Sequence, residues 1–100
     1  MPFLTNRMNK KYEEELIEVF ANAAQNKLVL KDFLLDILTR NEYQEIVVCW
    51  QIVKRLAKGE AQRTISKDLK IGIATVTRGS RELKDKKGGF SKVLAKMKLK

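Results

Sequence analysis

The sequence predicts an all-α fold, and three properties of its 100 residues support that prediction. Five glycines and one proline leave little material for the turns of a β-sandwich or barrel. Apolar residues recur along much of the chain at spacings of three and four, as on one face of an α-helix. Hydrophobic residues make up 44% of the chain, which is ordinary for a globular protein. A chain of this length suits one domain, residues 1–100, with a modest core.

Residues 9–60 are interpreted as a dimerisation scaffold of three helices, of which the first two lie within residues 9–38. The first helix covers residues 9–26, and its early glutamates meet the positive end of the helix dipole. The second covers residues 28–38 and is apolar on almost every side, so more than one neighbour should bury it. The apolar face of the first helix consists of Tyr12, Leu16, Val19, Phe20 and Ala23.

A capping box should begin the third helix of the scaffold at Thr39. In that pattern a threonine hydroxyl and the glutamate three residues later, here Glu42, satisfy amide groups at a helix start. The helix should run to Gly59, which offers a left-handed stop. Its predicted apolar stripe consists of Ile46, Trp50, Val53 and Ala57.

These apolar helices predict burial against another subunit as well as against one another. A symmetric homodimer is the simplest arrangement, and a monomer whose core takes all of these residues is the alternative. Cys49 is interpreted as a small core residue, because neither a histidine nor a second cysteine is present to activate it. The same composition excludes an intramolecular disulfide and argues against a metal site, a catalytic site and an enzyme.

The charge of the chain is distributed unevenly. The net charge is +9, and twelve of the 21 basic residues but three of the 12 acidic residues follow residue 60. The whole excess of positive charge therefore lies in residues 61–100, which indicates a neutral scaffold joined to an end that faces a polyanion. A solvated basic tail is the alternative interpretation.

Residues 61–84 are typical of a helix-turn-helix. A helix over residues 62–69 would turn Ile65 and Leu69 inward, residues 70–72 would interrupt it, and a second helix would run from residue 73 to about residue 84. In such a motif the second helix enters the major groove of DNA, whereas the alternative is an ordinary helical hairpin. The buried face of the second helix would hold Val76, Gly79 and Leu83, and its exposed face Ala74, Thr77, Arg78 and Arg81.

The run from Gly72 to Ser80, followed by Leu83 and Lys84, resembles the recognition helix of the bacterial tryptophan repressor family. The resemblance implies an all-helical, intertwined homodimer of six-helix chains that represses transcription by binding palindromic double-stranded operator DNA. Weaker similarity extends upstream to about residue 12, through Gln25-Asn26, Leu28, Leu38-Thr39, Glu42, Ile52-Val53, Leu56, Gly59-Glu60 and Gln62-Arg63.

The resemblance also assigns residues to DNA. Ile73 and Ala74 suit contacts with thymine methyl groups, and an arginine can fork to guanine or phosphate. Two residues depart from the family: Lys70 replaces a glycine of the turn, and Ser66 replaces a lysine of the first helix of the motif that contacts phosphate. The DNA-facing set is Gln62, Arg63, Gly72, Ile73, Ala74, Thr75, Thr77 and Arg78.

In this family tryptophan binds as a corepressor between the DNA-reading helices and the central helices. Arg78 corresponds to the arginine that pairs with the ligand carboxylate. Cys49 replaces a second arginine that covers the indole ring, Glu82 replaces a serine near the ligand ammonium, and Arg40 replaces a proline. Control by L-tryptophan, control by another small effector and constitutive DNA binding therefore stay open. The effector set is Leu38, Thr39, Cys49, Arg78, Gly79 and Glu82.

Residues 85–100 are expected to form a flexible break at 85–89, one short helix folded back onto the scaffold, and a basic tail. No apolar stretch approaches the roughly 18 residues needed to span a bilayer, and residues 1–15 lack the apolar core of a secretory signal. We therefore expect a cytoplasmic protein without a membrane partner. The competing function is a constitutive basic module that binds DNA or RNA without a corepressor. The short helix would be lined by Phe90, Val93, Leu94 and Met97, with Lys92, Lys96, Lys98 and Lys100 solvated.

Overall fold

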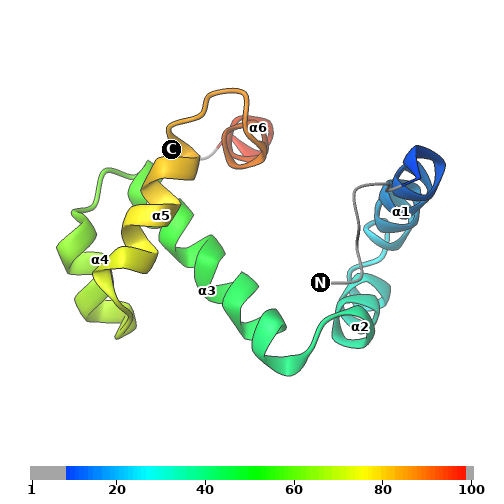
Figure 1. Cartoon of the computed structure of the whole chain (residues 1–100), viewed down its shortest axis with the longest axis horizontal. Coiled ribbons are helices and arrows are strands. Elements are labelled where there is room, and N and C mark those ends of the chain that lie inside the picture. The colour runs from blue at the N-terminus through cyan, green and yellow to red at the C-terminus, as the bar shows by residue number, and fades with distance from the viewer. Residues whose placement is uncertain (1–8, 99–100) are drawn as a thin grey trace. The chain divides into compact units, whose positions relative to one another are not determined.

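The computed structural model describes residues 9–98, which form six helices and, within that range, no strand (Figure 1). The all-α prediction with six helices is confirmed, while the intertwined dimer stays a prediction. None of the helices in this range is long and apolar enough to cross a membrane. The predicted solvated Lys100 and the N-terminal segment through Met8 lie outside the described residues. The helices are α1 (Lys10–Ala23), α2 (Lys27–Ile37), α3 (Arg40–Ala57), α4 (Gln62–Leu69), α5 (Ile73–Leu83) and α6 (Gly89–Met97).

The chain divides into two compact units, the first ending at Tyr43 and the second beginning at Gln44. This division falls inside α3, so it differs from the predicted boundary between scaffold and helix-turn-helix at residue 60. The reason lies in the core of the second unit, where Ile52 of α3 packs with Ile65 of α4 and Val76 of α5. Most of α3 therefore belongs with the helix-turn-helix.

Asparagine caps set the bounds of the two helices in the first unit. The Asn9 side chain accepts a hydrogen bond from the Lys11 amide at 2.8 Å, and the Asn26 side chain accepts one from the Leu28 amide at 3.0 Å. Because Asn26 caps α2, the first helix ends earlier than predicted, at Ala23.

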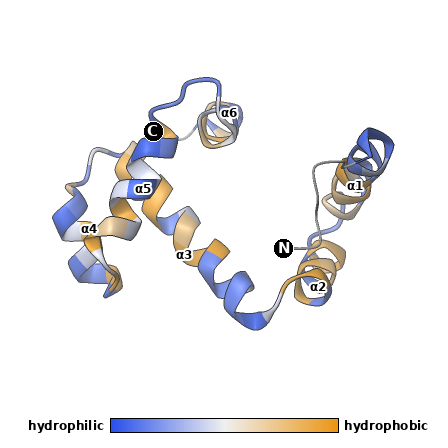
Figure 2. Ribbon diagram, in the orientation of Figure 1, coloured by the Kyte–Doolittle hydropathy of each residue, from blue (hydrophilic) through white to orange (hydrophobic). Residues whose placement is uncertain are grey.

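Apolar side chains of α1 and α2 stay largely exposed in the single chain. The orange segments of Figure 2 mark where hydrophobic residues occur along these two helices. The rings of Phe20 and Phe33 pack edge to face, with centroids 5.1 Å apart. Ala23 is buried, but no residue of α2 is, and Leu28 is 75% exposed. Burial of the second helix by more than one neighbour is therefore not found within one chain.

The second unit has a small core at the junction of α3, α4 and α5. Ile52, Ile65 and Val76 are at most 2% exposed, as predicted for the latter two. The predicted stripe of α3 is confirmed at Val53, which is buried, but it is wrong at Ile46, which is 52% exposed, and it omitted Ile52, which is buried. The α4–α5 pair covers the side of α3 that carries Ile52. The spacing of apolar residues along α3 does not predict which of its sides is covered. Partly buried residues around this core are Val48, Leu56, Leu69 and Ile71.

The last helix, α6, packs against α5 through an ordered turn. The Gly88 amide donates to the Asp85 carbonyl at 2.9 Å, and the Ser91 hydroxyl lies 3.0 Å from the same carbonyl. The segment predicted as a flexible break is thus a hydrogen-bonded turn. Leu94 is buried, whereas Met97 is 57% exposed, so only part of the predicted apolar side is covered in the single chain.

Gly79 allows α5 to approach α3 closely. It is buried, and a Cβ atom built on it would lie 2.9 Å from Cγ2 of Ile52, closer than such atoms pack. Because Ile52 is β-branched and has one strongly preferred rotamer in a helix, its Cγ2 atom has little freedom to withdraw. The spacing of these two helices therefore requires glycine at this position.

Replacing Gly79 by alanine should destabilise the second unit. The overpacked contact costs about 1–3 kcal/mol, and the better helix propensity of alanine returns at most about 1 kcal/mol, so a net loss is expected in urea denaturation. Gly89→Ala is the matched control, because a Cβ at the start of α6 meets nothing within 4 Å. Equal stability of the two variants would contradict the close approach.

Candidate nucleic-acid interface

The segment comprising α4, the turn and α5, residues 62–83, is named the reading head. Its turn is closed by Lys70, which has a left-handed backbone with φ 56° and ψ 47°. Such a conformation costs a non-glycine residue about 1 kcal/mol. The Ile71 amide donates to the Ser66 carbonyl at 3.1 Å, and the Ser66 hydroxyl donates to the Ile71 carbonyl at 2.6 Å. The predicted interruption at residues 70–72 is confirmed.

The outward face of the reading head contains the predicted DNA-facing residues. Gln62 is half-buried, and the other members of the set are exposed. On α5 the predicted inner positions Val76 and Gly79 are buried and Leu83 is half-buried, while the predicted outer positions are exposed. The predicted division of this helix into two faces is therefore confirmed, with Leu83 only partly covered. The exposed members are Arg63, Gly72, Ile73, Ala74, Thr75, Thr77 and Arg78.

Two residues of this set bind each other. The Thr77 hydroxyl lies 2.8 Å from the Gln62 side-chain oxygen and 3.0 Å from the Ile73 carbonyl. Because a hydroxyl has one proton, it donates to one of these acceptors at a time. The bond to Gln62 links the first residue of α4 to the middle of α5. Sequence reasoning named both residues but missed their contact, since 15 positions separate them.

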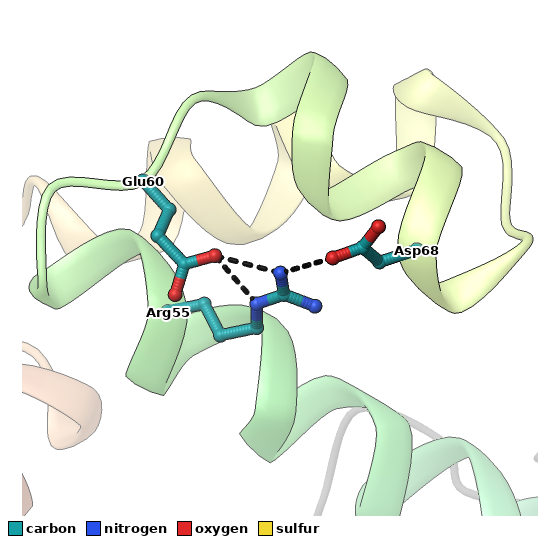
Figure 3. A network of polar contacts seen from close by, with 3 residues as sticks. All are labelled: Arg55, Glu60 and Asp68. Carbon is teal, nitrogen blue, oxygen red and sulfur yellow. Dashed lines mark hydrogen bonds and ion pairs between the residues drawn. The ribbon is translucent and has the colours of Figure 1, made fainter.

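An arginine at the end of α3 ties α4 to that helix (Figure 3). Nε of Arg55 donates to Oε1 of Glu60 at 2.8 Å, and its Nη2 atom lies 2.7 Å from Oε1 of Glu60 and 2.7 Å from Oδ2 of Asp68. Hydrogen bonding to Glu60, and then to Asp68, raises the pKa of the guanidinium above its ordinary value. No partner of Arg55 was predicted from the sequence, so this clamp of Arg55 to Glu60 and Asp68 was missed.

The predicted effector residues are divided between the two units. Leu38 and Thr39 belong to the first. The Thr39 amide donates to Oε1 of Glu42 at 2.8 Å, and the Glu42 amide donates to the Thr39 hydroxyl at 3.1 Å. The predicted capping box is thus confirmed. It engages the Thr39 hydroxyl as an acceptor and leaves its proton available.

The other effector residues lie on α3 and α5 of the second unit. Cys49 is half-buried, and Arg78 and Glu82 are exposed. Ile52 occupies the space beside Gly79 on the side where a Cβ atom would point. Arg78 and Glu82 lie four residues apart on α5 but do not form an ion pair, since the ion pairs of residues 9–98 all involve Arg55. The described residues also contain no cluster of three metal-ligating side chains.

Comparison with known proteins identifies relatives over most of the chain. A family model described as Trp repressor protein matches residues 11–98, which extends the similarity beyond residue 84 and through α6. The Trp operon repressor homolog of Vibrio vulnificus strain YJ016 is 41% identical over 73 residues, covering 71% of this chain and 70% of the relative. The homolog from Vibrio cholerae is 36% identical over 86 residues, covering 84% and 82%. The homolog from Aliivibrio salmonicida is 37% identical over 86 residues, covering 80% and 78%.

Arg55→Lys should weaken the attachment of α4 without changing the net charge. A lysine has no planar fork with which to engage Glu60 and Asp68 together, so one arm of the clamp should be lost. Because Asp68 is about half exposed, the loss of stability should be smaller than that from Gly79→Ala. Urea denaturation of Arg55→Lys, Asp68→Asn and the double variant should give non-additive changes. Additive changes would mean that the two side chains do not act together.

Proposed function

This chain belongs to the Trp repressor family, and we propose that it is a sequence-specific DNA-binding repressor that reads palindromic operator DNA through α5. The observation that carries the proposal is the exposed outer face of α5, opposite the buried Val76 and Gly79. A helix seated in this way offers side chains to a groove without disturbing its own packing.

The chemistry of that face supports DNA as the ligand. No side chain caps the start of α5 at Gly72, so the amides of Ile73 and Ala74 can donate to a ligand, and the positive end of the helix dipole favours a backbone phosphate. Ile73 and Ala74 offer methyl groups to thymine, while Thr77, Arg63 and Arg78 offer donors to base edges or phosphates. The whole net charge of +9 lies in residues 61–100, where the reading head is located.

A homodimer is part of the proposal. The first unit exposes large apolar side chains in the single chain, and a second copy of the same chain would cover them. Two reading heads related by a twofold axis match the two halves of a palindrome. The exposed residues of α1 and α2 are Tyr12, Leu16, Ile17, Val19, Leu28, Val29, Leu35 and Ile37.

Effector control is a further part of the proposal. An amino acid such as L-tryptophan would be held by Arg78, Thr39 and Glu82, with Leu38, Cys49 and Gly79 beside it, and would raise operator affinity. The exposed guanidinium of Arg78, which has no ion-pair partner among residues 9–98, supports this arrangement. Ile52 fills the space beside Gly79 on the side where a Cβ atom would point, which leaves less room for an effector and favours constitutive DNA binding instead.

The alternative function is a constitutive basic module, either architectural on DNA or bound to RNA. The concentration of positive charge after residue 60 favours it equally. The two functions differ in what they predict. A basic module binds with strong salt dependence and little sequence preference, whereas a repressor prefers its site by several kcal/mol.

Selection from a random double-stranded DNA pool at fixed salt, with and without tryptophan, tests the function and its control. We expect a palindromic site to be enriched, and tryptophan to increase the enrichment if Arg78 and its neighbours bind it. Enrichment that ignores tryptophan would support constitutive repression. If no sequence is enriched and the affinity for DNA varies only with the salt concentration, the proposed repressor function would be contradicted.

Thr77→Val should reduce discrimination among operator sequences about tenfold, the equivalent of one base contact. Valine keeps the shape of threonine but removes both the hydroxyl and its bond to Gln62. Competition binding against variant operators measures the change. Thr64→Val is the matched control, because Thr64 is exposed on α4 outside the DNA-facing set. Unchanged discrimination in Thr77→Val would remove this residue from the interface.

A further inference from the structure

Lys70 has an unfavourable backbone conformation that glycine would adopt without cost. Its φ of 56° is left-handed, and its side chain is exposed in the turn of the reading head. Strain of this kind is often retained at functional positions, and its presence justifies asking what the side chain does. Packing does not explain the residue, because an exposed side chain adds little to the core.

The neighbouring Ser66 has no side-chain group free to bind DNA. It is half-buried, and its hydroxyl donates to the Ile71 carbonyl at 2.6 Å across the turn. Its carbonyl accepts the Ile71 amide, so both polar parts of Ser66 hold the turn together. A side-chain contact with a phosphate at this edge of the reading head would therefore have to come from another residue.

The charges around the turn leave Lys70 available. Asp68, the nearest acid in sequence, is engaged by Arg55 through a 2.7 Å ion pair. Lys67 and Lys70 are both exposed, and Lys70 lies two residues before Gly72, which caps the start of α5. A phosphate drawn to the free amides of α5 would thus lie near the turn that carries this ammonium group.

We propose that Lys70 binds a backbone phosphate of the operator, supplying from the turn the cationic contact that Ser66 does not make. The proposal rests on the function proposed above and adds to it a residue outside the predicted DNA-facing set. It gives the left-handed lysine a role that glycine cannot perform: the chain accepts a less stable turn in return for a phosphate contact.

Lys70→Gly separates stability from binding. Removing the left-handed lysine should raise the urea midpoint, while operator affinity at about 0.1 M salt should fall roughly three- to tenfold. The plot of log affinity against log salt should become shallower by about 0.9 for each Lys70 that touches DNA. A merely structural residue would not change this slope.

Lys98→Gly is the matched control, since Lys98 has nearly the same backbone, with φ 58° and ψ 36°, at the end of α6. It loses the same charge and the same strain, and its salt slope should stay near that of the unmodified protein. Lys70→Gln tests the charge without the gain in stability, and it should lose affinity as Lys70→Gly does. Equal slopes and affinities for Lys70→Gly and Lys98→Gly would overturn the proposal. If the unmodified protein selects a palindrome, that result leaves the proposed function intact; if it selects none, both fail.

Discussion

The close packing of α5 on α3 is the constraint on which the second unit depends. Gly79 brings the backbone of α5 against Ile52, and this approach places Val76 in the same core as Ile65 of α4. Once the inner side of an α-helix is fixed, its outer side is fixed as well, because the period is 3.6 residues. Exposure of Thr77 and Arg78 is therefore a consequence of apolar packing elsewhere on the same helix.

Polar contacts then define the geometry that the apolar core leaves open. α4 has eight residues, too few to persist as an isolated helix in water. Ile65 anchors its middle, the clamp of Arg55 to Asp68 holds its last turn, and the bond from Thr77 holds Gln62 at its start. Partly exposed links of this kind add little stability each. Their effect is to restrict the angle at which a short helix lies on its neighbours.

Local chemistry explains what the sequence could predict. The bounds of α4, the interruption after it and the capping box at Thr39 depend on residues within a few positions of one another. The clamp of Arg55 to Asp68 spans 13 residues and needs the fold before it can be recognised. The buried side of α3 was misplaced in part for the same reason, because Ile46 and Ile52 are equally apolar and only the position of α4 and α5 separates them. The candidate site was predicted as a face, but its internal contacts were not.

The two units differ in what they can bury alone, and this has a consequence for folding. The second unit encloses Ile52, Val53, Ile65 and Val76 within one chain, whereas the first buries Ala23 and leaves most of its large apolar side chains exposed. A helix pair with so little core recovers too little free energy to offset the entropy of ordering its chain. With a second copy as the cover, the first unit would be stabilised by association and its stability would depend on protein concentration. The core beneath the reading head is enclosed within one chain and does not need a second copy. The folded structure of α5 would therefore depend on the single chain, whereas the placement of two reading heads beside each other would depend on the dimer.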